Sequence, residues 1–192
     1  REKKTYKKRV QKAKNIFRNE PADKQVREGD RFGYDYNIFV QKAQAWAGIT
    51  TDQGAGHFFL NGRIAGTTMQ REGKMRNGLA PENSYGKSGT ARFLDGGFKM
   101  GEHVNLGAGH AFMIGFGFEY KAPAARTAFQ AAQVNNDFVR DLKNEKVLTA
   151  ELGYQLSNAW LKANVNAYYS HLDDVTEQSM YYMDDRRSFT YV

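Results

Sequence analysis

The fold class is decided by the stretch Asn105–Tyr120, which reads NLGAGHAFMIGFGFEY. Large apolar groups dominate one parity of this stretch, and small or polar groups fill the other. The first set comprises Leu106, Ala108, His110, Phe112, Ile114, Phe116, Phe118 and Tyr120. Successive side chains of a strand point to opposite faces, whereas a helix would mix the two sets on every face. The stretch therefore predicts a β-strand much longer than the roughly 5–6 residues usual in globular proteins.

The same alternation recurs along most of the chain. It predicts further strands around residues 32–41, 58–64, 148–156 and 161–170, a weaker one at 91–100, and the start of another at 188–192. In the first of these, Tyr34, Tyr36 and Ile38 occupy the apolar parity. We expect an all-β fold for residues 32–192, an antiparallel up-and-down meander of about seven strands.

The connections between these strands alternate in length. The short ones are expected at Thr51–Gly56, Gly101–His103 and Ser157–Trp160, and the long polar ones at Met69–Thr90, Lys121–Lys146 and Asp173–Arg187. Short turns at one end and long loops at the other are typical of a membrane β-barrel. A soluble sandwich gives no reason for this asymmetry, because both of its ends face water.

Composition supports β structure and excludes several classes of protein. The 192 residues include 19 Gly, 11 Tyr and 13 Phe but only 3 Pro and no Cys. The absence of Cys excludes a disulfide scaffold, a thiolate metal site and a Cys nucleophile. No run reaches the roughly 18 apolar residues that a membrane-spanning helix requires, whereas a barrel strand requires only about 10 residues with every second one apolar.

The net charge of +7 belongs to one segment. Residues 1–31 hold 12 Lys and Arg against 5 Asp and Glu, and the remaining residues are balanced. We interpret 1–31 as a basic extracellular loop that either contacts anionic sugar-lipid headgroups of an outer leaflet or is only solvated. A nucleic-acid partner is the less favoured alternative, because the rest of the chain carries no excess positive charge.

A barrel wall needs apolar side chains towards lipid and aromatic side chains at the two interfaces. Trp46 and Trp160 fall at or beside expected short turns and are candidates for one aromatic girdle. The candidates for the other girdle lie towards the long loops, and they are Tyr34, Tyr36, Tyr120 and Tyr169. The alternative is an ordinary half-buried sheet with Tyr and Trp at the edges of its core.

Several motifs, taken in order, resemble the barrel domain of TonB-dependent outer-membrane receptors. They are Arg27–Tyr36 (REGDRFGYDY), Gly73–Gly78 (GKMRNG), Asn83–Ser88 (NSYGKS), Asn135–Asp137 (NND), Leu142–Lys146 (LKNEK) and Asp184–Phe189 (DDRRSF). The similarity extends over nearly all of residues 25–192. It implies that the strands form part of a transmembrane barrel of about 22 strands filled by an N-terminal plug. Both ends of the chain look cut, so we expect the plug and the remaining strands to lie elsewhere in a longer polypeptide.

The resemblance also implies a function. It is the import of a large, scarce nutrient, of siderophore, cobalamin, oligosaccharide or peptide type, across the bacterial outer membrane. Transport would be energised by TonB through the absent N-terminal region, and a surface lipoprotein is a further candidate partner. The loop residues Arg76, Tyr85 and Lys87 are the candidates for contact with the nutrient. A passive porin-like barrel and a soluble all-β module that binds glycan or protein are the rival functions.

The sequence gives little support for catalysis, and we expect no enzymatic activity, cofactor or metal. Gly86-Lys87-Ser88 lacks the earlier Gly of a phosphate-binding loop, because residue 81 is Pro. The four His are not spaced as a helical metal-binding pair, and they are His57, His103, His110 and His171. The adjacent carboxylates Asp173-Asp174 and Asp184-Asp185 lack a calcium-binding loop around them and indicate solvated loops.

Overall fold

The structure is a computed structural model that describes residues 25, 27–31, 33–183 and 188–191. Its elements are β1 (Tyr36–Gln53), β2 (Gly56–Gly73), β3 (Gly86–Gly107), β4 (His110–Lys121), α2 (Ala125–Ala128), β5 (Glu145–Ser157), β6 (Lys162–Asp173), β7 (Met180–Met183) and β8 (Ser188–Tyr191). Apart from the four-residue helix α2, the regular elements of the described residues are all β-strands, and the predicted all-β class is confirmed.

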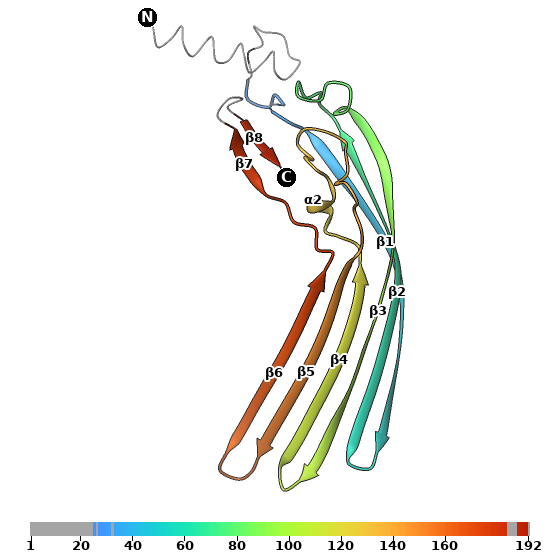
Figure 1. Cartoon of the computed structure of the whole chain (residues 1–192), viewed down its shortest axis with the longest axis vertical. Coiled ribbons are helices and arrows are strands. Elements are labelled where there is room, and N and C mark those ends of the chain that lie inside the picture. Colours follow the sequence, from blue (N-terminus) through green and yellow to red (C-terminus); the bar gives the residue numbers. More distant parts are fainter. Residues whose placement is uncertain (1–24, 26, 32, 184–187, 192) are drawn as a thin grey trace, which may run out of the picture.

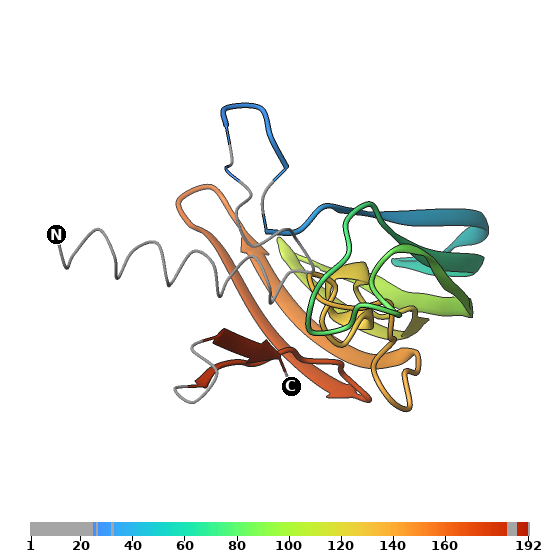
Figure 2. The same ribbon diagram turned by 90° about the horizontal axis from the view of Figure 1, so that it is seen from above.

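Strands β1 to β6 form one antiparallel sheet in the order of the sequence, and β7 pairs with β8 in a separate two-stranded sheet. Figure 1 shows the six long strands side by side in a single curved layer. Figure 2, seen from above, shows how the layer bends between its two edges. Strands β1 and β6 are these edges and do not pair with each other, so the sheet is open. The predicted up-and-down meander is confirmed for these six strands.

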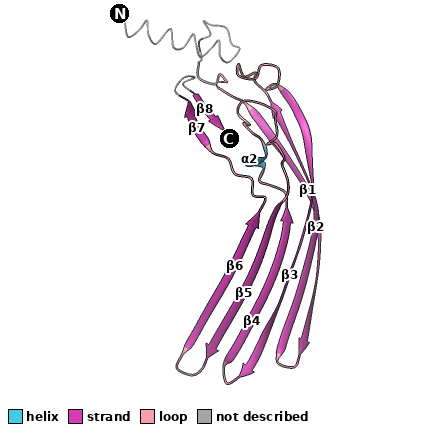
Figure 3. Ribbon diagram, in the orientation of Figure 1, coloured by secondary structure: helices cyan, strands magenta, loops and turns pink. Residues whose placement is uncertain are grey.

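The two ends of the sheet differ as the sequence predicts. Residues 54–55, 108–109 and 158–161 make tight turns at one end, which we call the turn end. Residues 74–85, 122–144 and 174–179 make the longer connections at the other, the loop end. Figure 3 shows the contrast, with long magenta strands between short pink turns below and larger pink loops above.

One predicted turn is misplaced. The range Gly101–His103 lies inside β3, and the turn is instead Ala108–Gly109. The sequence does not reveal this turn, because the alternation of large apolar and small or polar side chains continues through it without a break. A bulge between Asn105 and Gly107 adds one residue to β3, so odd-numbered residues pair with odd-numbered ones across the turn, as Asn105 does with Ala111. The long predicted strand is therefore the end of one strand and the whole of the next.

The other corrections lie at the loop end. Strand β2 continues to Gly73 and β3 begins at Gly86, so the connection predicted at Met69–Thr90 is shorter. The short strand β7 lies within the range predicted as a loop, and it pairs with β8. Of the predicted basic loop 1–31, residues 1–24 and 26 lie outside the described residues. The described part of it includes a turn in which Arg27 N donates to Asp30 Oδ2 at 2.7 Å.

Cross-strand pairing assigns each side chain to one of two faces, because directly opposed residues project to the same side of a sheet. The polar face carries the odd-numbered residues of β2 to β5 over most of their length, and the even-numbered residues of β1 and β6. The apolar face carries the others. The parities that the sequence predicts for β2, β4, β5 and β6 agree with this assignment.

Strand β1 differs from its predicted orientation. Tyr36 pairs with Gly73 and Ile38 with Arg71, so both lie on the polar face, where they pack against a buried cluster that contains Met69. The apolar parity of β1 was read from its first residues. These residues are apolar because a loop covers them on the polar side, and the prediction that they face the apolar side is wrong.

The turn between β3 and β4 provides a test of this register. Gly109 has φ +83°, and a Cβ there would collide with the carbonyl oxygen of Ser157, whereas Ala108 has φ 50° and is not a glycine. We expect Gly109→Ala to lower the free energy of unfolding by about 1–3 kcal/mol. Ala108→Gly, the matched control, should cause no loss, because glycine adopts positive φ without strain. Urea unfolding of the two variants measures this, and equal losses would contradict the turn geometry.

Candidate functional site

The polar face carries ion pairs that reach across intervening strands. Arg63 Nη2 on β2 lies 3.5 Å from Glu119 Oε1 on β4, and Lys99 Nζ on β3 lies 3.7 Å from Glu151 Oε2 on β5. Each pair skips a strand. The first does so at Gly97, which is the cross-strand neighbour of both Arg63 and Glu119. Because Gly97 has no side chain, the two longer side chains meet above it.

A hollow of about 360 Å³ lies on the polar face beside Gly97 and Gly117, and its wall includes Trp46, Asn61, Arg63, Lys99, Glu119 and Thr149. The Trp46 side chain is 76% exposed. The hollow therefore offers an indole ring, an amide, a hydroxyl and an ion pair to whatever lies against this face. The charges are already paired, so the hollow does not select for a single sign of charge.

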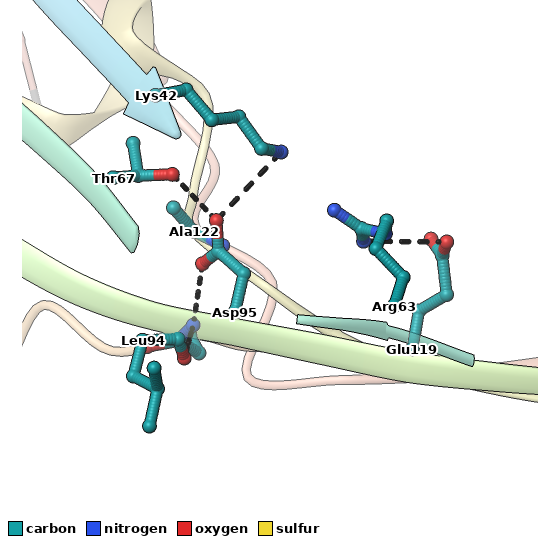
Figure 4. A network of polar contacts seen from close by, with 8 residues as sticks. Lys42, Arg63, Thr67, Leu94, Asp95, Glu119 and Ala122 are labelled. Carbon is teal, nitrogen blue, oxygen red and sulfur yellow. Dashed lines mark hydrogen bonds and ion pairs between the residues drawn. The ribbon is translucent and has the colours of Figure 1, made fainter. Parts of the chain in front are cut away.

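A buried carboxylate fastens the loop 122–144 to the same face. Asp95 of β3 is 1% exposed and accepts hydrogen bonds from Thr67 Oγ1 at 2.5 Å and from the backbone N–H of Ala122 at 2.7 Å. Asn144 Nδ2 donates to it at 3.1 Å, and Lys42 Nζ lies 3.7 Å away. Figure 4 shows Lys42, Thr67 and Ala122, the first residue of the loop, grouped around the Asp95 carboxylate. One carboxylate thus holds both ends of the loop.

A buried guanidinium fastens the middle of the loop. Arg71 of β2 is 1% exposed, and its Nε donates to the carbonyl oxygen of Ala132 at 2.7 Å. Its Nη1 donates to the carbonyl oxygen of Ser84 at 3.0 Å and to Asn136 Oδ1. The guanidinium carbon also lies 5.0 Å from the centroid of the Tyr36 ring. Arg71 therefore joins the loops 74–85 and 122–144 to the sheet.

Apolar packing completes the attachment of this loop. The rings of Phe129 and Phe138 stack with centroids 4.6 Å apart, and Phe129, Ala128 and Ala132 form a buried cluster with Met69 of β2. The loop therefore lies over the polar face near the loop end and does not stand away from the sheet. At the end of the loop, Lys146 of β5 and Lys143 of the loop form ion pairs with Asp174, and they lower the pKa of that carboxyl.

The apolar face is exposed across the whole sheet. Ile64, Leu94, Ile114, Leu152 and Val165, which lie on five different strands, are exposed by between 54% and 68%. Towards the loop end this face becomes polar, with Thr68, Gln70, Thr90 and Arg92. An apolar surface that extends across so many strands marks a site of contact with membrane or protein.

The structure does not place all the predicted girdle residues on one face of the sheet. Trp160 lies in the turn between β5 and β6, and Tyr120 and Tyr169 lie on the apolar face. Tyr34 precedes β1, with its ring 5.9 Å from that of Tyr36. Trp46 was expected beside a turn, but it pairs with Arg63 midway along β1 on the polar face. Trp46 and Tyr36 thus lie on the opposite face from the one predicted.

The predicted nutrient-contact residues all lie at the loop end. Arg76 and Tyr85 are exposed in the connection 74–85, and Lys87 is exposed as the second residue of β3, where it pairs with Glu72. No hydrogen bond or ion pair joins the three to one another. They share a rim but do not form a single compact site.

Sequence reasoning missed Arg71 and Asp95, the two residues that organise the loop. Each is a charged residue within a strand, two positions after an apolar residue on the same face, which is Met69 for Arg71 and Phe93 for Asp95. Their hydrogen-bond partners lie in the sequence motifs that resemble those of the receptor family. Ser84 belongs to NSYGKS, and Asn136 to NND. These motifs contact one another, since Asn83 Nδ2 also donates to Asp137 Oδ1 at 2.6 Å.

No helix within the described ranges has the length and apolar character needed to cross a membrane. Across the same residues, no group of three or more His, Cys, Asp or Glu is placed to hold a metal ion. Comparison of the chain with models of protein families, with curated proteins and with solved structures gave no match.

The attachment of the loop predicts a specific mutational effect. Arg71→Met should destabilise the protein by about 3–5 kcal/mol, because it leaves the carbonyls of Ser84 and Ala132 and the amide of Asn136 buried without their donor. It should also speed hydrogen exchange within 122–144. Lys99→Met removes an exposed ion pair on the same face and should cost less than about 1 kcal/mol. Exchange measured by mass spectrometry should therefore separate the two variants, and equal protection of the loop in both would contradict its attachment through Arg71.

Proposed function

We propose that this chain is part of the wall of the β-barrel of a TonB-dependent transporter in a bacterial outer membrane. The observation that carries the proposal is the exposed apolar face of a six-stranded meander whose tight turns all lie at one end. In hydrocarbon such a face is stable, whereas in water it would be a large unfavourable surface.

The height of the apolar face supports the proposal. On β4 the apolar-face positions run from His110 to Tyr120, which is ten residue steps. At a rise of about 3.3 Å per residue and a tilt of about 40°, this run spans about 25 Å along a membrane normal. That is about the height of the apolar band on outer-membrane barrels.

The open edges support a larger barrel. Strands β1 and β6 each leave a row of backbone N–H and C=O groups without a partner strand in the described sheet. No water is present in the core of a bilayer to satisfy these groups, so a spanning sheet must close. Six strands are fewer than the 8 or so of the smallest outer-membrane barrels, and the family resemblance suggests about 22. Further strands would then pair with both edges.

In such a barrel the polar face would line the lumen. The hollow beside Trp46 and the strand-crossing ion pairs would contact the plug or a passing nutrient, and the loop 122–144 would narrow the mouth. The imported compound would be a large nutrient of siderophore, cobalamin, oligosaccharide or peptide type. TonB would supply the energy through a region N-terminal to the barrel, and a surface lipoprotein is a further partner in this proposal. Arg76, Tyr85 and Lys87 would meet the nutrient at the outer rim.

The role of the wall in this proposal is binding and passage without covalent chemistry. Asp95 and Arg71, the most buried charged residues of the polar face, are occupied by the loop that they hold. They therefore have a structural part in shaping the mouth. Changes in the plug, driven by binding and by TonB, would move the nutrient.

A charge on the apolar face tests the membrane location. Ile114→Arg should reduce assembly into the outer membrane, because an Arg at the middle of the bilayer costs about 2–4 kcal/mol on a barrel surface. Thr149→Arg on the polar face is the matched control and should assemble normally. Membrane fractionation and detergent extraction of the full-length protein measure both. Recovery of both variants as water-soluble monomers would overturn the membrane location and favour the soluble binding module.

The absence of native cysteine in this chain permits a test of orientation. Tyr85→Cys at the loop end should react with a membrane-impermeant maleimide on intact cells, and Trp160→Cys at the turn end should react only after the cells are broken. The unmodified full-length protein gives the background. Equal labelling of the two positions on intact cells, or the reverse order, would contradict the proposed orientation.

A further inference from the structure

Glu102 is a carboxylate on the apolar face. It pairs with Phe58 on one side and with Ile114 on the other, so its side chain projects among apolar groups. The other Asp, Glu, Lys and Arg on this face of β1 to β6 lie near the loop end, and they are Glu72, Lys87, Arg92, Lys146 and Asp173. Glu102 alone lies in the half of the sheet nearer the turns. Charged residues are rare on such surfaces and commonly mark a functional contact.

The carboxylate lies at the rim of the apolar face nearest the turn end. A Cβ built on Gly56 would come within 2.8 Å of Glu102 Oε1, so the side chain extends over this glycine. Gly56 is the first residue of β2 and pairs with Gln53 directly beside the turn. In the proposed barrel this is the depth of the phospholipid headgroups on the periplasmic side. Because Gly56 has no side chain, it leaves room for the carboxylate at that depth.

Glu102 makes no hydrogen bond or ion pair with any side chain that the structure describes. Nearby charged groups are engaged elsewhere, since Lys99 binds Glu151 on the opposite face and His57 Nδ1 contacts Asp52 Oδ1 at 2.5 Å. The carboxylate therefore keeps its acceptor capacity for a group from outside the described chain.

A shallow apolar groove leads away from the carboxylate. Its volume is about 190 Å³, and its wall is made by Phe58, Met100, Gly101, Glu102, Ile114, Gly115 and Phe116. Glu102 and Ile114 form one row of paired residues, and Met100 and Phe116 form the next row away from the turns. The groove therefore extends from headgroup depth towards the middle of the bilayer, the direction of an acyl chain.

We propose that Glu102 and this groove bind a phospholipid with a primary ammonium headgroup, of the phosphatidylethanolamine type, from the periplasmic leaflet. A primary ammonium has N–H donors for the carboxylate, and such charge-assisted hydrogen bonds are strong. A choline headgroup has no N–H donor. An anionic headgroup would meet a negative charge with no free cation beside it. One acyl chain of the bound lipid would occupy the groove. The inference rests on the proposed membrane location of this face.

The test uses the full-length protein reconstituted in vesicles that contain phosphatidylethanolamine, phosphatidylcholine or phosphatidylglycerol. Lipids that stay bound after mild detergent extraction are counted by native mass spectrometry. We expect the ethanolamine lipid to be retained about tenfold more than either other lipid, the size of effect that a hydrogen bond to a charged group gives. Glu102→Gln, which keeps the shape and removes the charge, should abolish this preference. Glu72→Gln, on the same face at the opposite rim, should leave it unchanged.

The possible failures are distinguishable. If the unmodified protein inserts into vesicles and retains the three lipids equally, Glu102 is only solvated at the interface and the lipid site is overturned. The same conclusion follows if Glu102→Gln keeps the full preference. If the protein fails to insert into vesicles of any composition and remains soluble without detergent, the proposed function is overturned as well.

Discussion

The pairing of backbone N–H and C=O groups along six long antiparallel strands is the constraint on which the rest of the structure depends. Once the register is set, every side chain is assigned to one face or the other, and a slip of one residue would exchange the two faces. The bulge between Asn105 and Gly107 shows how tightly this holds, since one added residue keeps Phe98, Phe116 and Phe118 on a single side. The contrast between the two faces therefore follows from the ladder.

The two faces of the sheet differ in what covers them. The apolar face buries little within the chain, and it is stable only where something outside the chain covers it. The polar face covers itself in part, since the loop 122–144 lies over its upper region. There the buried charges of Asp95 and Arg71 have their hydrogen-bonding capacity largely met by the loop. A buried charge with well-placed partners fixes one arrangement of a loop, because any other arrangement leaves it without them.

Nearer the turn end, the loop does not cover the polar face, and small residues lie there between residues with long side chains. Gly97 and Gly117 form part of the hollow beside Trp46, and paired charges bridge it. Such a surface suits close approach by another polypeptide or a bulky solute without preference for one charge sign. This agrees with a lumen wall, and it contrasts with the self-contained core that a soluble sandwich of two sheets would have.

The sequence by itself determined the local pattern. Alternation of large and small side chains predicts the strands of the meander, and the lengths of the polar segments between them predict long loops at one end. It did not determine which way β1 faces, because a period of two fits both faces and only the loop packed on Tyr36 and Ile38 decides between them. It also did not place the turn at Ala108, because the bulge preserves the parity through it. The roles of Arg71 and Asp95 came from the tertiary structure alone. Arg71 meets Asn136 and Asp95 meets Asn144 across 65 and 49 positions of sequence, and no local pattern encodes contacts over such distances.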